Sequence, residues 1–267
     1  MTPLADALPE APYEHLPNPP LKAMLGQVRF PTILAVAEAS FVSPLQEAIR
    51  GEFPELRDER QVGLEVSAEG NVTTETSQIW RFMSEDGMWS VVLAPDYLTL
   101  EATTGQYTDF DGFRSRFGTV WERALPILRP AARVRQGLRY INHIPGELPG
   151  DWARFINAEL LGAVANPMFA DEVIQSLCDI RLGRPDGVLA FKHGVVPAGP
   201  TQELGFVLDF DYFTQERSEQ LSTEDILDVF SSYHTVIYNL FRWCVTPEAL
   251  ESFKQGGGVD DDAAPTS

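Results

Sequence analysis

The spacing of apolar residues along the chain predicts strands and amphipathic helices in a definite order. In residues 61–68, Val62, Leu64 and Val66 alternate with polar neighbours, which is typical of a strand with one buried face. Between residues 110 and 128 the apolar positions recur every three or four residues, as on one face of a helix. The segments expected in the first half are a strand at 25–30, a helix at 43–53, strands at 61–68, 78–83, 88–93 and 97–102, and a helix at 110–128.

The second half of the chain carries similar patterns in a similar order. Asp-Gly pairs at 86–87 and 186–187 each separate two short apolar runs, and Asp-Gly favours the tight turn of a β-hairpin. When residues 89–99 are laid over residues 204–214 without gaps, five of the eleven positions are identical. The segments expected in this half are a strand at 137–144, a helix at 151–161, strands at 177–182, 188–192, 204–210 and 212–215, and a long helix that begins at Ser222.

These patterns predict an α+β fold made of duplicated β-α-β4-α units. Residues 21–130 would form the first unit and residues 131–253 the second, packed together as one globular body. The alternative is that strands followed by helices look alike in many unrelated chains. Residues 1–20, rich in proline, are expected to be a flexible tail, and residues 254–267 a disordered acidic tail.

Composition and charge narrow the classes of partner. The 267 residues include 39 acidic and 20 basic side chains, and 44% are hydrophobic, enough for a substantial core. The formal net charge of -19 repels phosphate backbones and anionic lipids, so we expect neither nucleic acid nor a membrane as partner. Without a secretory signal or a long apolar run, the expected location is the cytoplasm. Cys178 and Cys244 lie in apolar segments and are expected to be buried free thiols.

Several short segments carry a pattern that is recognisable as a set. They are Pro20-Leu21, Val28-Arg29-Phe30-Pro31, Trp80-Arg81-Phe82, Glu85-Asp86-Gly87, Trp89-Ser90-Val91, Pro95-Asp96-Tyr97-Leu98, Leu100-Glu101 and Leu138-Arg139-Tyr140-Ile141-Asn142. In these segments, which cover nearly the whole folded region, the chain resembles an uncharacterised, sporadically distributed bacterial family of about this length. The resemblance implies no activity, cofactor or catalytic residue. The patchy distribution of that family suggests antitoxins and defence accessories.

The order of strands and helices also resembles the unit that is duplicated in the TATA-box-binding protein. This resemblance implies one curved antiparallel sheet with the helices on one face. It does not imply DNA binding, because the present chain is strongly acidic and a fold does not determine a function.

Motifs for catalysis, metals and cofactors are missing from the sequence. There is no glycine loop for phosphates, no His-Glu-x-x-His, no cysteine pair and no Gly-x-Ser-x-Gly, and the four histidines are scattered. We therefore expect no metal and no cofactor. His143 shares a strand face with Arg139, since strand side chains repeat every two residues. A local hydrogen bond is favoured for it over a role as general base.

Three arginines are the most suggestive candidates for a site. Arg29, Arg81 and Arg139 each stand between two large apolar residues of an expected strand. If the apolar neighbours face the helices, the arginines point together onto the open sheet face. With Asn142 and His143 they could line a recessed pocket for a small anionic ligand. Cross-strand ion pairs are the favoured interpretation, because a buried charge needs a partner and acids are plentiful. The acids expected as partners are Asp96, Glu101, Asp179 and Asp209.

Two further residues invite a catalytic interpretation. Asp96 and Asp211 occupy matching positions in the aligned stretches, each before a tyrosine, and could act as paired carboxylates. A turn role is favoured for both, because an aspartate side chain accepts hydrogen bonds from nearby backbone amides.

Three hypotheses of function follow. The leading one is a non-catalytic binding or regulatory protein with an acidic surface, acting through a protein partner as an antitoxin, immunity protein or phage-defence accessory. The alternative is a protein that binds a small anionic molecule, or a metal-independent enzyme, with its pocket on the concave sheet face. The third is recognition or mimicry of nucleic acid, which the charge disfavours.

Overall fold

The computed structural model describes residues 8, 10–66, 72–103, 109–145, 152–168, 172–198 and 203–254. Within these residues the protein is α+β, and nine strands form one antiparallel sheet in the order β2-β3-β4-β5-β1-β6-β9-β8-β7. The strands are β1 (Leu21–Arg29), β2 (Glu55–Val66), β3 (Val72–Met83), β4 (Trp89–Ala94), β5 (Tyr97–Thr103), β6 (Arg135–Pro145), β7 (Ser176–Arg184), β8 (Gly187–Ala198) and β9 (Glu203–Thr214). The helices are α2 (Ala39–Ile49), α3 (Phe110–Leu128), α4 (Trp152–Phe155), α5 (Thr223–Cys244) and α6 (Pro247–Lys254), with short 3-10 turns at Leu34–Ala37, Ala158–Leu160 and Gly162–Ala165.

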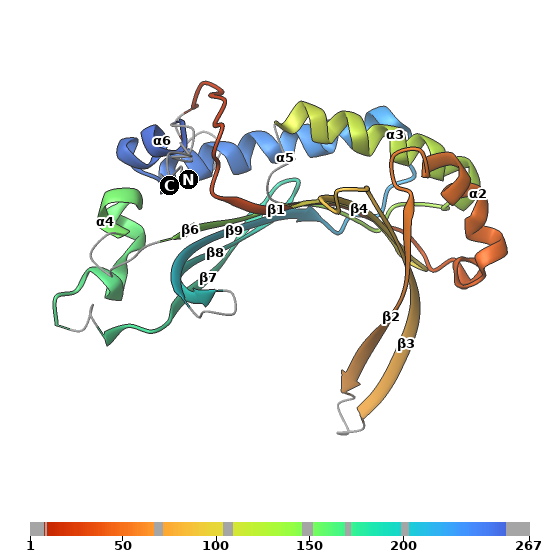
Figure 1. The fold of residues 1–267 in the computed structure, drawn as a ribbon, viewed down its shortest axis with the longest axis horizontal. Coiled ribbons are helices and arrows are strands. Elements are labelled where there is room, and N and C mark those ends of the chain that lie inside the picture. The colour runs from red at the N-terminus through yellow and green to blue at the C-terminus, as the bar shows by residue number, and fades with distance from the viewer. Residues whose placement is uncertain are drawn as a thin grey trace, which may run out of the picture.

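The sheet is curved, and the long helices α3 and α5 lie with α2 over its convex face (Figure 1). We call the opposite side the concave face. The strands alternate as expected: in β1, Met24 and Val28 are fully buried beneath the helices, whereas Gln27 and Arg29 are only partly buried. Gly26 leaves room for the rings above, because a Cβ there would lie 3.0 Å from Phe113 of α3. The apolar core therefore lies between the sheet and the helices.

The second half of the chain departs from the predicted unit. Residues 204–210 and 212–215, expected as two strands, instead belong to one continuous strand, β9, which ends at Thr214. The described residues thus follow β6 with three strands, and the prediction of four is wrong. The helix expected at 151–161 is also wrong, since only the one-turn α4 and short 3-10 turns occur there.

The gapless alignment of residues 89–99 with residues 204–214 pairs segments of different structure. Residues 89–99 cover β4, a turn and the start of β5, whereas residues 204–214 lie in a single strand. As a result, Tyr97 points to the concave face while Tyr212 is buried under the helices. Five identities in eleven positions reflect the common alternation of apolar and polar residues in strands, and they do not identify a repeat.

Helix α2 begins earlier than its sequence suggested. Pro44, expected at the first helical position, lies in the middle of the helix, where its missing N–H would leave the carbonyl of Ser40 without a partner. The Ser43 hydroxyl donates a hydrogen bond to that carbonyl at 3.3 Å. A local side-chain donor therefore replaces the lost backbone bond and allows the proline inside the helix.

The N-terminal segment is not a loose tail in its described part. The Ala11 amide donates to the Asn239 side chain at 3.2 Å, the Glu14 amide donates to the Tyr238 hydroxyl at 2.9 Å, and Asn18 donates to the carbonyl of Phe253 at 3.0 Å. These contacts place residues 11–18 against α5 and α6, whereas the sequence analysis expected a flexible tail over residues 1–20. At the other end, Lys254 closes α6, and residues 255–267 lie outside the described residues.

Two other sequence-based expectations have clear outcomes. Cys244 is a buried free thiol as predicted, but Cys178 on the edge strand β7 is exposed. The prediction for Cys178 rested on its apolar neighbours in the sequence. Those neighbours did not show that the residue lies in the edge strand, where one side of the strand has no neighbouring strand. Among the described helices, none combines the length and apolar character that crossing a bilayer requires.

Candidate functional site

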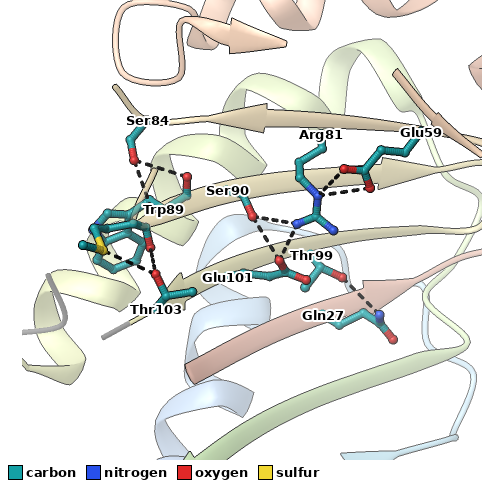
Figure 2. A network of polar contacts seen from close by, with 10 residues as sticks. Gln27, Glu59, Arg81, Ser84, Trp89, Ser90, Thr99, Glu101 and Thr103 are labelled. Atoms are coloured by element: carbon teal, nitrogen blue, oxygen red, sulfur yellow. Dashed lines mark hydrogen bonds and ion pairs between the residues drawn. The ribbon is translucent and has the colours of Figure 1, made fainter. Parts of the chain in front are cut away.

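The concave face carries a network of charged residues around Arg81 of β3. Its Nε lies 3.1 Å from Oε1 of Glu59 on β2, and its Nη1 lies 2.5 Å from Oε2 of Glu101 on β5. Ser90 bridges the network from β4: Arg81 donates to its hydroxyl, which donates to Glu101 at 3.0 Å (Figure 2). Burial alone would lower the pKa of Arg81, but Glu101 and Glu59 raise it above its ordinary value. Four adjacent strands are thereby tied together by one guanidinium.

The other two predicted arginines are also paired. Arg139 of β6 forms a bidentate ion pair with Asp209 of β9, with Nε–Oδ1 and Nη2–Oδ2 distances of 2.8 and 2.7 Å. These hydrogen bonds raise the pKa of the Arg139 guanidinium above its ordinary value. Arg29 pairs with Asp96, which lies in the turn between β4 and β5, where the sequence analysis expected it. The interpretation of these arginines as structural ion pairs agrees with this geometry.

The structure adds a fourth pair that the sequence analysis did not single out. Arg135 of β6 binds Asp211 at 3.1 Å, and its guanidinium lies 4.4 Å from the centre of the Phe213 ring. Burial lowers the pKa of Arg135 and raises that of Asp211, although the pair remains in contact. Asp211 is thus an ion-pair partner within a strand, so the turn role expected for it is wrong. No motif marked Arg135, which precedes its strand's apolar run.

The three predicted arginines do not converge on one pocket. Arg81 lies on β3, three strands away from Arg29 on β1, or ~14 Å at the usual strand spacing. In the register of β1 with β6, Arg29 lies opposite Arg135, while Arg139 lies opposite Leu25, ~13 Å further along the strand. Each guanidinium is held by its own carboxylate. The concave face is therefore a row of separate ion pairs.

The acids expected as partners behave as predicted with one exception. Asp96, Glu101 and Asp209 each bind one of the three arginines. Asp179 instead lies 3.7 Å from Lys192 of β8. This exception follows from the register, which places Asp179 directly opposite Lys192.

Asn142 and His143 point to opposite faces of β6. Asn142 is buried on the helix side, where its amide donates to the Leu208 carbonyl at 3.1 Å. It therefore cannot line a concave pocket with Arg139. His143 does share the concave face with Arg139, but its buried Nε2 has no hydrogen-bond partner among the described residues. Burial, and then Lys22, lower the pKa of His143, so the ring is neutral near physiological pH.

A small cavity of about 80 Å³ lies on the other side of the sheet, between β6, β9, α5 and the N-terminal segment. His234 of α5 lies in its wall, 2.9 Å from the Tyr140 hydroxyl through Nδ1 and stacked on Phe110 at 4.0 Å. Burial lowers the pKa of His234 to about 4, so this imidazole is neutral at physiological pH. The sequence analysis did not identify this pair, because 94 positions separate the two residues. It treated Tyr140 as an apolar strand residue and His234 as one of four scattered histidines. Chemically, the neutral His-Tyr pair can orient a small molecule by hydrogen bonding.

In the parts of the chain that the structure describes, no group of three or more His, Cys, Asp or Glu side chains could hold a metal ion. His143 lies in β6, His193 in β8, His15 in the N-terminal segment and His234 in α5. On the concave face, Glu59, Glu101, Asp209 and Asp211 already bind arginines, and Asp179 lies beside Lys192.

Comparison with known proteins leaves the family open. No protein-family model and no curated protein matches the chain. Among solved structures, the chain is similar to the di-domain aromatase/cyclase StfQ from the steffimycin biosynthetic pathway, with 10% identity over 82% of this chain and 96% of that chain. The TM-score is 0.15, so this similarity carries no argument about fold or activity.

Proposed function

We propose that this protein is a non-catalytic binding and regulatory protein of the cytoplasm, which holds a protein partner against its concave face. The class of protein is that of antitoxins, immunity proteins and phage-defence accessories. The observation that carries the proposal is the pairing of every predicted site arginine with its own carboxylate. Such a face offers preformed polar contacts to a large surface and leaves none of these guanidinium groups free for a small anion.

A second observation supports a partner at one edge of the concave face. Strands β2 and β3 pair over twelve residues, but β4 pairs only with residues 80–83 of β3. Residues 59–66 and 72–79 therefore form a two-stranded arm that projects away from the helices (Figure 1). A two-stranded ribbon is marginally stable in water, so contact with a partner would stabilise it.

The charge of this arm indicates the kind of partner. Residues 59–66 and 72–79 contain three acidic residues and one basic residue, in a chain with a net charge of -19. An acidic arm attracts a basic surface and accelerates its encounter with the protein. The proposed partner is accordingly a protein whose contact surface is rich in lysine and arginine.

To test the proposal, the tagged protein is purified from its own cells at low salt, and the molecules that co-purify with it are identified by mass spectrometry. We expect a stoichiometric protein partner that dissociates as the salt concentration rises. Reversing two charges of the arm, with Glu65→Lys and Glu75→Lys, should release the partner while the far-ultraviolet circular dichroism stays unchanged. The matched control reverses two exposed charges on the helices, with Glu122→Lys and Glu224→Lys, and should keep the partner.

Two results would contradict the proposal. One is a purified protein that turns over a metabolite and has no stable partner in its own cell. The other is a partner that both charge-reversed proteins retain equally, because the contact would then lie away from the arm.

We also infer that the sheet arose by duplication of one unit, with its axis between β1 and β6. The order of strands supports this, because each half begins with a central strand and ends with a strand that returns to it, followed by a long helix. A duplicated origin also accounts for the position of β1 and β6 side by side at the centre of the sheet.

A further inference from the structure

A second, larger pocket lies at the end of the sheet where β6 begins and β9 ends. Its volume is about 260 Å³, and residues of α5 form part of its wall. Four elements contribute to it: Arg133 before β6, Thr214 at the end of β9, Asp186 in the β7–β8 turn, and Tyr233 of α5. This volume lies just below the usual range of ligand pockets, so its size suits a small metabolite.

Arg133 distinguishes this pocket from the concave face. Only 9% of Arg133 is exposed, yet no carboxylate of the described residues lies within ion-pair distance of it. Its guanidinium donates to the neutral Gln136 side chain, and its buried Nε has no hydrogen-bond partner in the described part of the chain. By contrast, Arg139 has 41% of its side chain exposed and a bidentate carboxylate. The more deeply buried arginine is thus the one without a counter-charge.

Such an arrangement is unfavourable unless something else supplies the negative charge. A buried charge without a partner costs several kcal/mol, because neither water nor an opposite charge compensates it. Arginine cannot escape by losing its proton. A guanidinium presents a flat pair of donors that matches a carboxylate or a phosphate group. We propose that this pocket is a binding site for a small anion, and that Arg133 holds its carboxylate or phosphate group.

The neighbours of Arg133 are compatible with an anion of limited charge. Arg217, on the exposed rim, adds a second positive charge. Asp186 and Glu216 also line the pocket. The Asp186 carboxylate accepts a hydrogen bond from the Tyr212 hydroxyl at 2.5 Å, and Glu216 is exposed to water. The two acids limit how much negative charge the site accepts, which favours a singly or doubly charged small molecule over a polyphosphate.

The chain is held around this pocket by contacts that do not use the guanidinium. The backbones of Arg133 and Ser218 bond to each other in both directions, at 2.9 and 3.0 Å. The Tyr233 hydroxyl donates to the Asp186 carbonyl at 3.3 Å. Since the frame is built from backbone atoms and from Tyr233, the Arg133 side chain can be replaced without removing these contacts.

The test uses the full-length protein with inorganic phosphate as the probe. Thermal unfolding is followed in phosphate and in sodium chloride of equal ionic strength, and affinity is measured by isothermal titration calorimetry. We expect phosphate to raise the melting temperature of the wild-type protein above that in chloride. Arg133→Met should weaken phosphate binding by about tenfold or more. In chloride it should lower the melting temperature less than Arg139→Met does, because removal of an uncompensated buried charge offsets the lost hydrogen bond to Gln136.

Arg139→Met is the matched control, since it makes the same substitution at an arginine that has a carboxylate. It should lower the melting temperature and leave phosphate affinity within about twofold of wild type. If Arg133→Met does not fold, Arg133→Lys takes its place and should bind phosphate more weakly than wild type. The proposal is overturned if wild-type protein shows neither a phosphate-specific melting shift nor binding heat, or if the Arg133 variants bind phosphate as wild type does.

Discussion

Removing the Arg139 side chain tests whether the ion pairs on the concave face stabilise the fold. Two opposite charges ~4 Å apart attract by ~4 kcal/mol at the effective dielectric constant of a protein surface. Asp209 has only 10% of its side chain exposed, but Arg139 has 41% exposed, so solvent screening reduces the net coupling to ~1–2 kcal/mol. Arg139→Met also leaves Asp209 nearly buried without its partner, so we expect a total loss of ~2–3 kcal/mol in the free energy of unfolding.

The assay is urea unfolding followed by tryptophan fluorescence for wild type, Arg139→Met, Asp209→Asn and the double variant. The double-mutant cycle isolates the coupling between the two side chains from other effects of each substitution. For a chain of this size, a loss of 2 kcal/mol corresponds to roughly 4–8 °C in melting temperature. An exposed pair serves as control: Arg50→Met, which breaks the contact with Glu47, should cost less than ~0.5 kcal/mol.

The reasoning is refuted if the coupling is below ~0.3 kcal/mol and Arg139→Met unfolds like the wild type. In that case Arg139 would be free to serve a ligand, and the variant should lose ligand binding while its stability is unchanged. A loss of both stability and partner binding would instead place Arg139 in the surface that the partner covers.

Three further predictions concern other parts of the molecule. Burial lowers the pKa of His234 to about 4, so as the pH falls below ~6.5 the unfolded chain takes up a proton before the folded protein does. Between ~pH 6.5 and 4 the free energy of unfolding of the wild type should therefore fall by up to ~3 kcal/mol more than that of His234→Phe, as measured by urea unfolding. Cys178 should react with a thiol reagent in the native protein, whereas Cys244, buried and with a raised pKa, should react only after unfolding. Gly205→Ala should destabilise the protein and move His143, because a Cβ there collides with the imidazole; denaturant unfolding and the histidine NMR signals report the two effects.

Local sequence patterns predicted much of this fold, because alternation and helical spacing reflect burial directly. The strands of the first half, the long helices and the placement of helices on one face follow from them. The continuous strand β9 did not, since the aspartates at 209 and 211 resemble a turn when their partners Arg139 and Arg135 are unknown. Strand register decides whether such a residue faces an arginine, and register is set by contacts between distant segments.

The candidate site was predictable in part for the same reason. That Arg29, Arg81 and Arg139 share a face follows from alternation, and their pairing with acids follows from the cost of an isolated charge. Their separation across the sheet depends on strand order, which one sequence does not contain. Arg133 gave no signal at all, because its burial arises from the meeting of β6, β9 and α5.

The docking of residues 10–20 onto α5 and α6 has a consequence for the rate at which the protein unfolds. The hydrogen bond from Ala11 to Asn239 joins residues 228 positions apart, so closing it carries a large loop-closure entropy. We therefore expect these contacts to form after the folding transition state, and contacts that form there slow unfolding. Removal of residues 10–20 should therefore raise the rate of unfolding and leave the rate of folding nearly unchanged.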